Sequence, residues 1–93
     1  MHVGVIVVHI FIPDASSLKA KRMVLRRIKD RIRFNFNVSI AEVDSQDKWQ
    51  RAALAASCVS NEKKHADSML NKVRDFFERD KNITVTDYKM EII

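Results

Sequence analysis

Residues 3–12 read VGVIVVHIFI. Apolar side chains, most of them β-branched, occupy both alternating sets of positions, as in a strand that is covered on both faces. The run is too short for a membrane span of about 20 residues, and it lacks the preceding basic residues and the cleavage pattern of a signal peptide. We therefore expect a central strand of a sheet, ended by Pro13.

A helix is expected after this strand, over residues 18–34. Ser17 is placed to cap it, because a hydroxyl can accept one of the unpaired backbone N–H groups of the first turn. At helical spacing one face is apolar and is expected to meet the sheet; its residues are Leu18, Val24, Leu25, Ile28 and Ile32. Lys21 falls inside this apolar arc, and we expect its ammonium group to extend outward to water.

The remainder of the chain is predicted to alternate strands with a second helix. The strands are expected over residues 38–44, 50–60 and 83–92, and the helix, capped by Asn61, over residues 62–80. Residues 51–56, RAALAA, have helix propensity, but a helix there would leave the preceding strand without a partner. We therefore interpret this segment as a strand with small side chains.

The predicted order, β-α-β-β-α-β, is that of an α+β ferredoxin-like fold, in which two helices cover one face of a four-stranded antiparallel sheet. A single domain, residues 1–93, is expected from the length. The first and third strands lie in the middle of such a sheet, and both are apolar or small on both faces, whereas a face open to water should be polar. We therefore expect that face to be covered, most simply by a second copy in a homodimer.

Positive charge is concentrated in the first predicted helix. Residues 17–34 carry eight basic and one acidic side chain, whereas the rest of the chain is slightly acidic and the whole has a net charge of +5. Five of the cations form one stripe along the helix: Lys19, Arg22, Arg26, Lys29 and Arg33. Two interpretations remain open: a solvated or partner-neutralised face, or a surface about 21 Å long that binds a polyanion such as RNA.

A second candidate surface is the turn between the second and third strands. Three carboxylates, those of Glu42, Asp44 and Asp47, lie near this turn. No histidine is placed near them for acid–base work. In a purely structural interpretation Asp44 and Asp47 bond turn N–H groups and pair with Arg51, while Trp49 packs at the sheet edge. The alternative is a protein-binding hairpin formed by Asp44, Asp47, Trp49 and Arg51.

No catalytic residue, metal, cofactor or small-molecule substrate is predicted. Cys58 and His65 lack the paired spacing of structural zinc ligands, and Gly4 stands alone, so there is no phosphate-binding loop. The aromatics of an RRM and the GXXG loop of a KH domain are also missing, so any RNA contact falls to the basic stripe. With one cysteine an internal disulfide is impossible, and the reducing cytoplasm is the expected compartment.

Three blocks of sequence resemble the YlxP-like family of small bacterial proteins. They are Ser17, Leu18, Lys19, Lys21 and Arg22; residues 37–61, which include Glu42, Asp44, Asp47, Trp49, Gln50 and Arg51; and the ending MEII. The resemblance implies a ferredoxin-like domain and no known activity. Genes of the family often lie among those for translation initiation and ribosome maturation. Family members commonly have Glu in place of Ala20, which with Ser17 would complete a capping box.

Two functions are therefore expected as alternatives. The first is a cytoplasmic, non-enzymatic accessory protein that contacts RNA or a ribosomal particle through the basic stripe. The second is a homodimeric protein-interaction module that acts through its sheet face and residues 44–51, with no role in nucleic-acid binding.

Overall fold

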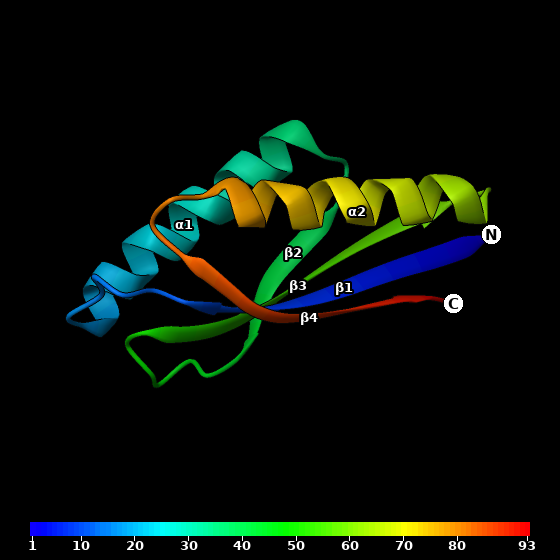
Figure 1. Ribbon diagram of the computed structural model, residues 1–93. Helices are drawn as coiled ribbons and strands as arrows, with labels where there is room; N and C mark the ends of the chain where they lie inside the picture. The colour runs from blue at the N-terminus through cyan, green and yellow to red at the C-terminus, as the bar shows by residue number, and fades with distance from the viewer.

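The computed structural model describes residues 1–93 without a gap and has the expected order of elements. In chain order they are β1 (His2–Phe11), α1 (Leu18–Asn35), β2 (Ser39–Asp44), β3 (Arg51–Ser60), α2 (Lys63–Arg79) and β4 (Thr84–Ile92). The four strands form one antiparallel sheet in the order β2-β3-β1-β4, and both helices lie on the same side of it (Figure 1). The expected ferredoxin-like α+β fold is confirmed.

The core lies between the sheet and the two helices. Its fully buried side chains include Ile6, Val8 and Ile10 of β1, Leu25, Ile28 and Ile32 of α1, and Leu70, Val73 and Phe77 of α2. Close packing of α2 on the sheet depends on Gly4, because a Cβ atom there would lie 3.0 Å from a methyl carbon of Leu70 and 3.2 Å from the Cys58 sulfur. Each helix buries its apolar face against the sheet. The opposite faces of α1 therefore remain on the surface.

The start of α1 is capped as expected. The Ser17 Oγ accepts a hydrogen bond from the backbone N–H of Ala20 at 3.0 Å. No acidic side chain lies in the first turn, so the reciprocal half of the capping box is missing and the Ser17 hydroxyl is the only side chain that caps this end.

Replacing Ser17 with alanine is expected to lower the free energy of unfolding by about 1 kcal/mol, because one backbone N–H of the first turn loses its acceptor. Urea denaturation followed by circular dichroism measures this change. The neighbouring exposed Ser16 makes no side-chain hydrogen bond, so Ser16→Ala is the matched control and should leave stability unchanged. Equal effects of the two substitutions would contradict the role of Ser17 as a cap.

The start of α2 differs from the prediction. Asn61 does not cap this helix; the N-cap position belongs to Glu62, which makes no side-chain capping bond. The Ser60 Oγ instead accepts the backbone N–H of Glu62 at 3.1 Å, and the Glu62 carboxylate lies 3.6 Å from His65. The Ser60 hydroxyl therefore holds the turn that precedes α2. The prediction of Asn61 as the cap did not take Ser60 into account.

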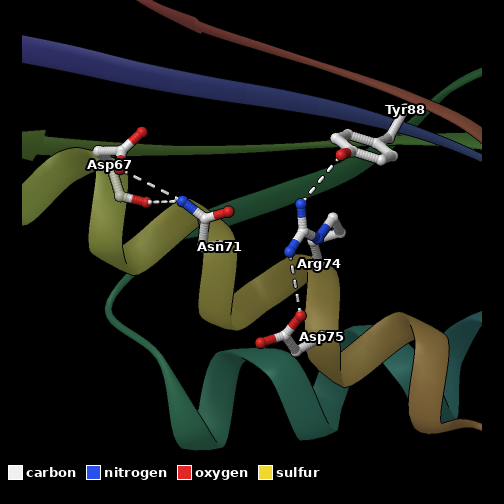
Figure 2. Close-up of polar contacts among 5 residues, drawn as sticks. All are labelled: Asp67, Asn71, Arg74, Asp75 and Tyr88. Carbon is white, nitrogen blue, oxygen red and sulfur yellow. Dashed lines mark hydrogen bonds and ion pairs between the residues drawn. The ribbon is translucent and has the colours of Figure 1, made fainter.

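Polar contacts connect α2 to the edge strand β4 (Figure 2). The Arg74 guanidinium donates to the Tyr88 hydroxyl at 2.9 Å, lies 5.1 Å from the centre of its ring, and contacts Asp75 at 3.4 Å. The hydrogen bond to Tyr88 raises the pKa of Arg74 above its already high usual value. One turn earlier, the Asn71 amide donates to the backbone carbonyl of Asp67 at 2.9 Å. These contacts hold α2 against β4 and stabilise the fold.

Candidate nucleic-acid interface

The five cations of the predicted stripe lie on the surface of α1. Lys29 is half-buried, and the others are exposed; these are Lys19, Arg22, Arg26 and Arg33. Because Leu25, Ile28 and Ile32 are turned into the core, the adjacent face of the helix borders the edge strand β2. The structure therefore places the stripe at the junction of α1 and β2.

The charge of the stripe is almost uncompensated within the protomer. Of the five cations only Arg33 has an acidic partner within 4 Å, and this contact, to Asp30 at 3.7 Å, is between two exposed side chains. An exposed pair of this kind contributes little. By contrast Arg27, which lies on α1 outside the stripe, pairs with Asp80 at 3.1 Å. The four remaining cations of the stripe present their full charge to the solvent.

A groove of about 440 Å³ runs between α1 and β2, and we call it the basic groove. It is lined by Arg22, Leu25, Arg26, Lys29, Asp30, Arg33 and Glu42. A hollow of about 270 Å³ lined by Lys19, Arg22, Met23 and Arg26 adjoins it at one end. At the other end Arg33 also lines a hollow of about 550 Å³ that reaches Ser39 and Ser57 of the sheet. The three depressions share arginines and thus follow the whole stripe.

Arg33 is held where the basic groove meets the sheet. Its Nη2 atom donates to the backbone carbonyl of Ile40 in β2 at 3.0 Å. β2 is an edge strand, so this bond satisfies a carbonyl that has no neighbouring strand on that side. The guanidinium still has other donors, since it carries five N–H groups.

Lys21 lies behind the basic groove, and the prediction that it extends to water was wrong. Its side chain is 2% exposed, and its Nζ atom lies 2.6 Å from the Ser45 carbonyl oxygen, 2.7 Å from that of Lys48 and 2.9 Å from Glu42 Oε2. These three acceptors match the three donors of an ammonium group. Two of them come from the β2–β3 loop, which folds over the start of α1, and the third comes from β2. A helical projection of α1 alone does not show these contacts.

The β2–β3 loop is fixed at both ends. Besides the two bonds from Lys21, the Asp44 carboxylate accepts the backbone N–H of Ser45 at 2.7 Å, and Gln50 donates to the Pro13 carbonyl at 2.9 Å. Ser45 has a φ of 65°, in the left-handed region that non-glycine residues seldom adopt. In Figure 1 this loop lies at the same end of the molecule as the start of α1. The loop is therefore a well-defined surface feature.

The four hairpin candidates do not converge on one site. Arg51 does not pair with Asp44 or Asp47 as expected; its guanidinium lies 5.0 Å from the ring centre of Phe11, on the face of the sheet opposite the helices. Asp44 bonds a turn N–H as expected, and Asp47 is exposed. Trp49 is 54% exposed and so does not pack at the sheet edge.

Comparison with known proteins identifies the family. The model described as "Protein of unknown function (DUF503)" matches residues 3–90. The chain belongs to this family. A DUF503 relative, "Uncharacterized protein YlxP" of Bacillus subtilis (strain 168), is 40% identical over 79 residues, which cover 81% of this chain and 86% of the relative. The expected resemblance to YlxP is thereby confirmed.

The fold of this DUF503 chain recurs in a protein of unrelated sequence. A de novo designed protein with a ferredoxin fold, solved by solution NMR, matches with a TM-score of 0.51 at 17% identity, over 98% of this chain and 85% of the designed one. At this identity the likeness concerns the fold alone. The chemistry of the DUF503 chain therefore has to be argued from its own side chains.

The DUF503 structure shows neither a metal-binding cluster nor a membrane-spanning helix. No group of three or more His, Cys, Asp or Glu side chains lies close enough to hold a metal ion together. Neither helix has the length and apolar character needed to cross a membrane. Cys58 is buried and His65 is exposed. The basic groove brings together Arg22, Arg26 and Lys29, three cations without an acidic partner within 4 Å.

Proposed function

We propose that this DUF503 protein is a cytoplasmic, non-enzymatic accessory protein that binds RNA, free or within a ribosomal particle, through the basic groove. One observation carries the proposal: four of the five stripe cations have no acidic partner, and three of these line a single groove together with Arg33. Phosphate groups of a nucleic-acid backbone would neutralise these cations and release bound counterions. Contacts of this kind position a protein on the backbone without reading the bases.

The acidic residues of the basic groove do not cancel its charge. Glu42 is paired with the buried Lys21 behind the groove, at 2.9 Å, and Asp30 lies beside Arg33 at 3.7 Å. Arg22, Arg26 and Lys29 therefore face the groove with no acid of their own. Arginine suits this role because its planar fork of N–H donors fits phosphate oxygens.

Fluorescence anisotropy with a single-stranded and a hairpin RNA across a potassium chloride series tests this function. If four or five phosphates are neutralised, the logarithm of the association constant for the single strand should fall with the logarithm of salt concentration with a slope of about −3. Binding without salt dependence, or no binding at low salt, would overturn the proposal. The stripe would then be a solvated or partner-neutralised face, and the hairpin that bears Trp49 would become the leading candidate surface.

A further inference from the structure

No helix covers the face of the sheet opposite α1 and α2, and we call it the open sheet face; Val59 on it is exposed, Val3, Val5 and Val7 are half-buried, and Ala53 is buried. Ile6, Val8 and Ile10 of β1 point into the core, so the alternate residues of β1 and their partners on β3 point the other way. These residues are Val3, Val5, Val7, His9 and Phe11 of β1 and Arg51, Ala53, Ala55, Ser57 and Val59 of β3. Alternating polar residues are expected where a sheet faces water, and the centre of this face has valines instead.

We propose that a second copy of this chain covers the open sheet face, with a two-fold axis that runs parallel to the strands between β1 and β3. In each protomer Val7 is paired with Ala55 and Val5 with Ser57. The rotation places Val7 at the same height over the partner's Ala55, and Val5 over the partner's Ser57. At these two central positions a larger side chain of β1 thus meets a small side chain of β3, which is the interdigitation that packed sheets require.

Charge on the open sheet face is nearly balanced, unlike charge on the rest of the molecule. Its edge along β4 carries Asp87, Lys89 and Glu91, which are paired in register with His9, Val7 and Val5 of β1. With Arg51 of β3, and with Asp44 of β2, which is paired with Ala53, the face has two basic and three acidic side chains. The excess of positive charge lies on α1, in the helical layer on the other side of the sheet (Figure 1). Two copies can therefore associate without bringing their basic stripes together.

The size of the face is sufficient for a specific contact. Strands of ten residues extend about 33 Å, and four strands side by side are about 19 Å wide. The face therefore has an area of roughly 600 Å², and two copies bury about 1,200 Å², the lower end of the range for stable protein interfaces. A reversible dimer is expected, with a basic groove on each of its two outer faces. The dimer itself does not depend on RNA binding.

Sedimentation equilibrium over a range of about 1–200 µM protein tests the dimer. Val59 is 68% exposed and lies on the open sheet face, so Val59→Lys should preserve the protomer fold and raise the dimer dissociation constant at least tenfold. The control is Ser68→Lys, which adds the same charge at an exposed position of α2, and it should leave the dissociation constant unchanged. A wild type that stays monomeric throughout, or a Val59→Lys protein that dimerises as the wild type does, overturns the proposal.

The position of the axis has its own test. The proposed rotation places Val59 over the partner's Val3, because these two residues are paired within each protomer. Val3→Glu and Val59→Lys proteins should each be monomeric at concentrations where the wild type is a dimer. Mixed together they should recover a heterodimer, which native mass spectrometry resolves. Failure of the mixture to associate overturns this axis.

Discussion

Replacing Lys21 by methionine is expected to lower the free energy of unfolding by about 3–5 kcal/mol, the range for removing one partner of a buried ion pair. The substitution keeps the length of the side chain but leaves the Glu42 carboxylate and the carbonyls of Ser45 and Lys48 without their shared donor. The Oε2 atom of Glu42 is fully buried, and it pairs with the Lys21 ammonium group at 2.9 Å. Total stabilities of such domains are about 5–15 kcal/mol, so this loss is large.

Urea denaturation measures the effect, and Lys19→Met is the matched control. Lys19 lies on the same helix, is exposed and has no ion pair; its replacement should change stability by less than about 0.5 kcal/mol. A double-mutant cycle with Glu42→Gln should show a coupling energy of about 1 kcal/mol or more, because the two side chains are in contact. If Lys21→Met is as stable as the control, the buried contacts of Lys21 do not hold the loop to α1.

Reversing three charges of the basic groove is expected to weaken RNA binding about 100-fold at ~0.1 M salt. Each neutralised phosphate on a single strand contributes a salt slope of about −0.7, so each contact is worth roughly fivefold at 0.1 M relative to 1 M salt, and three contacts multiply to about 100-fold. The variant is Arg22→Glu/Arg26→Glu/Lys29→Glu, whose three side chains line the groove. Its salt slope should be about 2 units shallower than that of the wild type.

The matched control reverses three exposed cations of α2 instead. Lys63→Glu/Lys64→Glu/Lys72→Glu changes the net charge by the same amount, and none of these lysines has an acidic partner within 4 Å. This control should retain most of the RNA affinity. Equal losses in the two variants would mean that binding follows net charge and not the groove. Circular dichroism must first show that both variants are folded.

The extent of each element followed from local patterns. Apolar alternation, the helical spacing of Leu25, Ile28 and Ile32, and the need of residues 38–44 for a partner strand were enough to predict all six elements in their correct order. The exposed basic stripe could be predicted in the same way, because side chains at helical spacing share a face whatever lies beneath them. The start of α2 was predicted wrongly: Glu62, not Asn61, occupies the N-cap position and makes no capping bond, and the Ser60 hydroxyl holds the preceding turn.

The contacts of Lys21 and Arg51 lay beyond any local pattern. Lys21 meets Ser45 and Lys48 across more than twenty residues of chain, and Arg51 lies over Phe11 of a neighbouring strand. In sequence, Lys21 is one cation among eight in its segment, and the chemistry of its side chain does not distinguish it from those that face the solvent. Its position inside the apolar arc of the helix was the one available signal.

By itself, the sequence determined the fold, the chemical character of each surface and the position of the positive charge, because helical and strand periodicity are properties of neighbouring residues. Only the tertiary structure decided which cations are available to a ligand. The tertiary fold brings the β2–β3 loop over Lys21, whose ammonium group is buried among three oxygen atoms. It leaves Arg22, Arg26 and Lys29 lining a groove without acidic partners. That division depends on distances between residues far apart in the chain, which no local pattern encodes.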